Sequence, residues 1–130
     1  MKTPARLASW LLQLIAAAIL LQTLYFKFTA ASESVYIFRT LGLEPVGRLG
    51  SGVTELIAAA LLLSGRWSVY GAALALLVML GALTAHLFTP LGIEVQGDGG
   101  LLFGLAITVA VCSLCVLWLR RQQWPPVMRR

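Results

Sequence analysis

The sequence predicts an all-α integral membrane protein, a four-helix transmembrane bundle with a short amphipathic surface helix between the first two transmembrane helices. Hydrophobic residues make up 59% of the 130 residues and charged residues only 12%, which is about half the charged share of a soluble domain. Four long apolar stretches follow one another, and most basic residues stand at their ends. Because so little charge could not cover a water-facing globule, we expect residues 1–130 to form one domain in a lipid bilayer.

Each apolar stretch is expected to form one transmembrane helix, since each approaches the ~20 residues that cross the hydrocarbon core. Pro45 suits a first helical position, Ser64-Gly65 ends the second helix, and Pro90 stops the third. The first stretch is too long for a signal peptide and lacks small cleavage residues at its end, so we expect it to remain as an anchor. The expected helices cover about residues 8–28, 45–64, 67–88 and 100–119.

The segment between the first two helices has a different pattern. Over about residues 33–41, Val35, Phe38 and Leu41 make one apolar stripe, which is typical of a short amphipathic helix at a membrane surface. We expect the surrounding segment, residues 32–48, to be the surface that a membrane or periplasmic protein partner would contact.

The distribution of charge predicts the orientation. Cytoplasmic loops carry an excess of Lys and Arg, so both termini are expected in the cytoplasm. The net charge is +5, but the sequence has no basic face and no nucleic-acid-binding motif. Anionic lipid, and not nucleic acid, is therefore the expected partner of the basic residues. Seven of the ten basic residues fall on the expected cytoplasmic side: Lys2, Arg6, Arg66, Arg120, Arg121, Arg129 and Arg130. The four tryptophans belong to the same side: Trp10, Trp67, Trp118 and Trp124.

The third helix carries small residues that favour close packing. Gly81 and Ala85 have the small-xxx-small spacing, which lets helix backbones approach in lipid. The short turn at Ser64-Gly65-Arg66 makes the second and third helices antiparallel neighbours, so a compact bundle follows. The sequence leaves open whether the chain also forms a homo-oligomer.

Five polar side chains are candidates for a binding pocket. Glu55 lies well inside the second helix, and an unpaired ion at that depth costs several kcal/mol. Lys27 lies near the outer end of the first helix, and His86 lies at an equivalent level in the third. Arg48 shares a helical stripe with Glu55, and Asp98 stands at the start of the fourth helix. We therefore expect one polar pocket that opens on the outer side.

A purely structural interpretation of the same residues stays open. Lys27 could extend to the lipid headgroups, Asp98 could cap the fourth helix, and His86 could bond a backbone carbonyl. For Glu55 the functional interpretation is favoured, because ionisable residues inside membranes usually belong to functional sites.

Cys112 and Cys115 form a Cys-x-x-Cys pair in the fourth helix and are the candidate redox thiols. Apolar surroundings suppress the reactive thiolate, and a continuous helix gives a poor disulfide geometry, so we expect both to be inert. One His and no close carboxylate pair predict no metal site and no covalently bound cofactor.

Ordered motifs along nearly the whole chain resemble the DoxX-like family of small four-helix bacterial membrane proteins. Lys27, Glu55 and His86 are the most specific positions of this resemblance. The motifs lie at residues 26–29, 33–38, 41–45, 54–58, 81–83, 86–87 and 97–100.

The resemblance implies a multi-pass protein of the bacterial inner membrane. Some members are membrane subunits of oxidoreductase assemblies such as a thiosulfate:quinone oxidoreductase, others belong to oxidative-stress complexes, and distant animal relatives are receptor-assembly chaperones. We therefore expect an accessory or ligand-binding subunit of a quinone-linked redox or oxidative-stress system, which uses the outward-facing polar pocket and is not a stand-alone enzyme. A quinone is the candidate ligand. The alternatives are a non-catalytic assembly module with a structural polar network and, as a lesser one, a small proton-coupled transporter.

Overall fold

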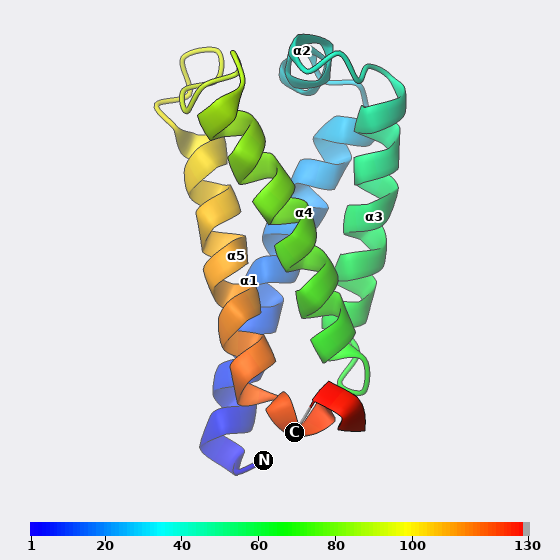
Figure 1. Ribbon diagram of the computed structural model, residues 1–130, viewed down its shortest axis with the longest axis vertical. Coiled ribbons are helices and arrows are strands. Elements are labelled where there is room, and N and C mark those ends of the chain that lie inside the picture. Colours follow the sequence, from blue (N-terminus) through cyan, green and yellow to red (C-terminus); the bar gives the residue numbers. More distant parts are fainter. Residues whose placement is uncertain (129–130) are drawn as a thin grey trace.

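The computed structural model describes residues 1–128, and within that range all the regular secondary structure is helical (Figure 1). Arg129 and Arg130, which contribute to the charge pattern, lie outside the described residues. Two short 3-10 turns, at Arg121–Gln123 and Pro126–Met128, follow the last helix. The five α-helices are α1 (Thr3–Phe28), α2 (Ser32–Thr40), α3 (Val46–Leu62), α4 (Ser68–Phe88) and α5 (Leu101–Leu119).

Four long helices, α1, α3, α4 and α5, run side by side, and α2 lies across one end of them (Figure 1). Helix α1 packs against α3 and α5, and α4 packs against the same two helices. Both marked chain ends lie at the end of the molecule opposite α2 (Figure 1). The loop between α4 and α5 lies at the same end as α2.

Three of the helices, α1, α4 and α5, are long and apolar enough to cross a membrane. Large apolar side chains also cover their outer surface, as at Leu77 and Phe88, which are exposed. In water such a surface would be unfavourable, so these helices indicate a membrane protein in a lipid bilayer. Helix α3 has 17 residues and carries Arg48 and Glu55, so it is shorter and more polar than the other three.

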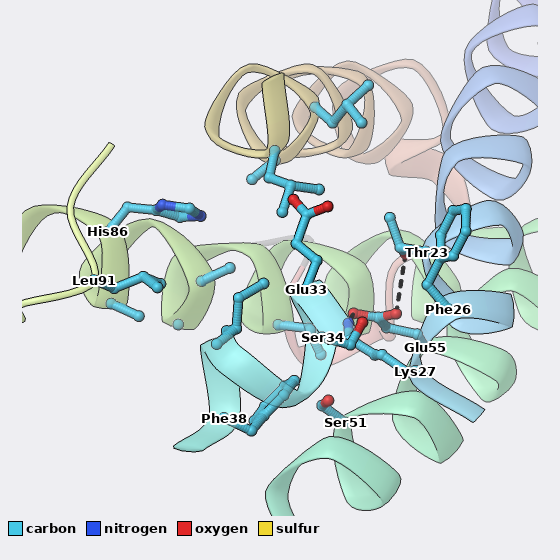
Figure 2. Close-up of a pocket in the computed structure, with 18 of the residues that line it drawn as sticks. Thr23, Phe26, Lys27, Glu33, Ser34, Phe38, Ser51, Glu55, His86 and Leu91 are labelled. Carbon is cyan, nitrogen blue, oxygen red and sulfur yellow. Dashed lines mark hydrogen bonds and ion pairs between the residues drawn. The ribbon is translucent and has the colours of Figure 1, made fainter. Parts of the chain in front are cut away.

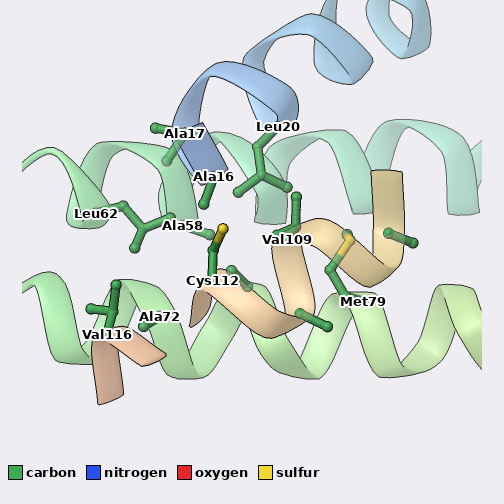
Figure 3. Close-up of a cluster of buried hydrophobic side chains, with 14 residues drawn as sticks. Ala16, Ala17, Leu20, Ala58, Leu62, Ala72, Met79, Val109, Cys112 and Val116 are labelled. Carbon is green, nitrogen blue, oxygen red and sulfur yellow. The ribbon is translucent and has the colours of Figure 1, made fainter. Parts of the chain in front are cut away.

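Small side chains occupy the core between the helices (Figure 3). Because lipid tails are as apolar as the core, helices in a membrane associate through close packing instead of a hydrophobic drive. A close approach lies at Gly71 of α4, where an added Cβ would lie 2.5 Å from the backbone nitrogen of Leu62 in α3. The fully or nearly fully buried core residues include Ala16, Ala17, Leu20, Ala58, Ala59, Leu62, Ala72, Ala75, Val109 and Val116.

The observed helices differ from the expected ones at a few points. Helix α1 begins at Thr3 instead of near residue 8, with a proline in its first turn, where no hydrogen bond from that nitrogen is required. The close contact expected at Gly81 and Ala85 is not found, since an added Cβ at Gly81 would meet no atom within 4 Å. Gly81 and Ala85 instead line a cavity, and Gly71 makes the close helix contact.

A buried polar network joins the helices at the end where the chain termini lie. The Arg120 side chain is only 4% exposed and donates hydrogen bonds to Ser9 Oγ (2.7 Å) and Gln13 Oε1 (2.8 Å). Gln13 Nε2 in turn donates to the Leu62 carbonyl at 2.6 Å. These bonds link α1, α5 and the end of α3. Arg120 therefore has a structural role that its position in a run of surface arginines did not predict.

Candidate functional site

A cavity of about 540 Å³ lies at the α2 end of the four long helices (Figure 2). All five α-helices contribute to its wall, and α2 forms its roof. Most of the lining is apolar, from side chains such as Phe38, Val78 and Leu105. The polar side chains of the wall are Thr23, Lys27, Ser32, Glu33, Ser34, Ser51, Glu55 and His86.

Lys27 of α1 and Glu55 of α3 form an ion pair on this wall. The Glu55 side chain is 2% exposed, so without a partner its charge would carry a large desolvation cost. Lys27 Nζ meets one carboxylate oxygen, and the Thr23 hydroxyl lies 3.3 Å from the other (Figure 2). Two of the five residues expected in the pocket are therefore together, and each neutralises the other.

Arg48 does not reach Glu55, although both lie on the same stripe of α3. Its Nε donates to both oxygens of Glu44, at 2.9 and 3.1 Å, because the two residues are four apart at the start of the helix. Its Nη1 donates to the backbone carbonyl of Lys27. Arg48 is not among the residues that line the cavity, and it instead ties the end of α1 to the start of α3.

His86 of α4 lines the cavity, but, like Arg48, it does not bond Glu55. Its Nδ1 lies 2.8 Å from the carbonyl oxygen of Gly92, and its ring packs edge-to-face against Phe103 of α5. Because a carbonyl only accepts hydrogen bonds, Nδ1 must carry the proton. When the ring is neutral, Nε2 is consequently an acceptor. Within residues 1–128 no side chain or backbone group bonds it.

Asp98 does not belong to the cavity wall and stabilises the turn that leads into α5. Its carboxylate accepts backbone hydrogen bonds from Val95 (3.0 Å), Gly100 (2.8 Å) and Leu102 (3.2 Å). Burial raises the pKa of Asp98, but these backbone donors outweigh that effect and hold the pKa below its ordinary value. The expectation that Asp98 joins the pocket is not met, because the nearby amides of its own turn satisfy it.

Glu33 was missed as a site residue by the sequence analysis. It lies in the first turn of α2, half-buried, and faces the cavity (Figure 2). The spacing of Glu33, Ile37 and Leu41, each four residues apart, could have identified it, since all three line the cavity. Phe38 and Leu41 of the predicted stripe also line the cavity but Val35 does not, so the side of α2 that faces the cavity is turned toward Glu33 and Ile37.

The two cysteines lie away from the cavity. Cys112 is buried in the apolar core beside Ala16 and Val109 (Figure 3), whereas Cys115 is exposed. Both thiols are free. Within residues 1–128, no group of three or more His, Cys, Asp or Glu side chains could hold a metal ion.

Comparisons with protein-family models, with curated proteins and with solved structures found no match to this chain. The chemistry of the site must be inferred from its geometry. The wall combines a large apolar surface, a neutralised ion pair, several hydroxyl groups, and the acceptors Glu33 and His86 Nε2 outside that pair. This combination suits the binding of a molecule with an apolar body and a polar end.

Proposed function

We propose that this chain is a membrane protein of four transmembrane helices that binds a small amphipathic ligand in the cavity beneath α2. The single observation that carries this proposal is the cavity itself. Its volume of about 540 Å³ falls within the range of roughly 300–1,000 Å³ that is typical of small-molecule sites. A mostly apolar wall with a few convergent polar groups is also typical of such sites.

The proposal places α3 in the membrane as the fourth span. Its two internal charges are Arg48 and Glu55, and each has a partner of opposite charge, in Glu44 and Lys27 respectively. Pairing removes much of the cost of placing charge at membrane depth. The excess of basic residues at the end opposite α2 favours cytoplasmic termini. The cavity then lies in the half of the protein that faces away from the cytoplasm. The membrane that we propose is the bacterial inner membrane.

A narrower proposal follows from the resemblance to DoxX-like chains. In that view the protein is an accessory subunit of a quinone-linked redox or oxidative-stress system, without a reaction of its own. A quinone has a polar ring and an apolar tail, and this shape matches a cavity with polar and apolar parts. A proton-coupled transporter would also use Glu55, but the pairing with Lys27 favours a fixed charge over a carrier.

The alternative is an assembly module whose polar residues only hold the helices together. It accounts for the pair of Lys27 and Glu55, for the Arg48 bonds and for the role of Asp98. It does not account for a cavity with unpaired polar groups on its wall. Interiors are normally close-packed, and empty space of this size weakens a bundle that has no ligand.

Filling the cavity with a side chain tests the proposal. Gly81 lines the cavity, Gly104 of α5 does not, and an added Cβ at either position would meet no atom within 4 Å. Gly81→Leu therefore occupies cavity space, whereas Gly104→Leu is the matched control with the same gain in helix propensity. The melting temperature of each protein in lipid nanodiscs would be measured at increasing concentrations of dodecanol, a small amphipathic probe.

The wild type and Gly104→Leu are expected to gain thermal stability as dodecanol increases, because a ligand that binds the folded state stabilises it. Gly81→Leu is expected to show little gain. Equal behaviour of all three proteins would favour the assembly module instead.

A further inference from the structure

Two acceptor groups on the cavity wall, the Glu33 carboxylate and His86 Nε2, are unpaired within the described part of the chain. We infer that the cavity selects ligands whose head donates hydrogen bonds, and that it holds a positively charged amine most tightly. This inference rests on the proposed function, since it names the class of ligand for the same cavity.

Glu33 supplies the negative charge. It comes from the roof helix α2, and in Figure 2 its carboxylate lies between the His86 side of the pocket and the Lys27–Glu55 side. The ion pairs among residues 1–128 join Lys27 to Glu55 and Arg48 to Glu44, and neither includes Glu33. A carboxylate that faces an apolar cavity without a partner gains most from a cationic donor, because charge-assisted hydrogen bonds are stronger than neutral ones.

His86 supplies the second acceptor. The bond from its Nδ1 to the Gly92 carbonyl fixes the ring with Nε2 on the other side. The side chain is only 7% exposed, so bulk water does not readily replace a ligand there. An ammonium group has three donors, so an amine head that bonds the Glu33 carboxylate or His86 Nε2 still has donors for other polar groups of the wall.

A head that only accepts hydrogen bonds finds a poorer site. The nearest cationic donor on the wall is Lys27, and its ammonium already meets Glu55. Lys27 and Glu55 cancel each other, which leaves the Glu33 charge as the excess charge among the described lining residues. A carboxylate head would therefore be repelled, whereas a ketone or an oxidised quinone could accept only from a neutral wall hydroxyl, such as that of Ser34, or from Lys27, whose charge Glu55 already neutralises.

The test compares long-chain probes that differ only in the head group. Dodecylamine, dodecanol, a dodecyl methyl ketone and dodecanoate would be titrated against protein in phosphatidylcholine nanodiscs, with binding counted by native mass spectrometry. Tryptophan fluorescence would not serve, because the tryptophans lie away from the cavity wall. The amine is expected to bind about tenfold or more tightly than the ketone and the carboxylate, with the alcohol between them.

Two variants separate the effect of the Glu33 charge from the effect of negative surface charge in general. Glu33→Gln keeps the size of the side chain and removes its charge, so it is expected to lower amine affinity about tenfold and to leave dodecanol affinity nearly unchanged. Glu94→Gln removes an exposed acid at the same end of the molecule that does not line the cavity, and is expected to leave all four affinities unchanged. A loss of amine binding in both variants would show a general surface-charge effect and would overturn the inference.

The outcomes also distinguish this inference from the proposed function. Equal binding of the four probes to the wild type, with loss of all of them in Gly81→Leu, would overturn the head-group selectivity and leave the cavity as a ligand site. Absence of binding of every probe to the wild type would contradict the proposed function itself.

Discussion

Lys27, near the end of α1, and Glu55, inside α3, form an ion pair on the wall of the cavity. The pair joins two neighbouring helices and removes the cost of a buried carboxylate. It also leaves neither charge free on the cavity wall. Glu33 of the roof helix and His86 of α4 also line the cavity, and neither takes part in an ion pair among residues 1–128.

Glu55→Gln is expected to lower the stability of the protein. The amide keeps the shape of the side chain, but the Lys27 ammonium loses its counter-charge, and the expected loss in free energy of unfolding is about 1–3 kcal/mol. Thermal unfolding in detergent measures this loss. Glu44→Gln is the control, since the Glu44 side chain is 19% exposed against 2% for Glu55, and Arg48 keeps its bond to the Lys27 carbonyl, so this loss of charge should matter less. Unchanged melting of Glu55→Gln would show that the pair does not stabilise the bundle.

Gly71→Ala is expected to disturb the contact between α3 and α4. The added Cβ would lie 2.5 Å from Leu62 N and 2.8 Å from Leu61 Cβ, so the helices must move apart, at a cost of about 1–3 kcal/mol. Gly104→Ala adds the same methyl group in open space and should stabilise the helix slightly. If the two variants melt at the same temperature, the close approach at Gly71 is not required.

Asp98→Asn is expected to destabilise the turn before α5 by about 1 kcal/mol, as the loss of a capping carboxylate typically does. Because the pKa of Asp98 is lowered in the folded state, ionised Asp98 stabilises the fold above the ordinary aspartate pKa of about 3.9. This stabilisation disappears as the pH falls through the lower folded-state pKa. The difference in melting temperature between wild type and Asp98→Asn should therefore shrink in acid, and a difference that grows in acid would contradict this role.

Single cysteines would test the orientation. In a background with Cys112 and Cys115 replaced by Ala, Glu94→Cys should react with a membrane-impermeant reagent added outside intact cells. Gln122→Cys should react only after the cytoplasmic side is opened. Both positions are exposed and lie near opposite ends of α5. Labelling of both positions from one side would contradict the proposed four-span topology.

The sequence predicted the helical elements well, because long apolar runs and Pro or Gly breaks depend only on local residues. It also predicted that the deeply placed Glu55 carboxylate needs a partner, with Lys27, Arg48 and His86 as the candidates, and the partner in the structure is Lys27. It could not predict the partners of Arg48 and Asp98. Arg48 bonds Glu44, and Asp98 bonds backbone amides of the 95–102 turn, so neither side chain is available to the pocket. The four-helix membrane bundle itself stays a prediction, since three helices meet the length and hydropathy of a membrane span.

The cavity was harder to predict from the sequence. Gly81 and Ala85 have the spacing of a close helix contact, yet they leave space there, because the tight contact of α4 forms at Gly71. The role of Glu33 depends on how α2 is rotated about its own axis, and a short amphipathic pattern with apolar residues on two adjacent stripes does not fix that rotation.

The most direct test of the central claim is native mass spectrometry of the protein released gently from its own membranes, with no ligand added. The wild type and Gly104→Leu are expected to carry one small amphipathic molecule per chain, and Gly81→Leu is expected to be released without it. A wild-type spectrum with no bound molecule, or with the same adducts in Gly81→Leu as in Gly104→Leu, would contradict the claim that the cavity beneath α2 is a ligand site.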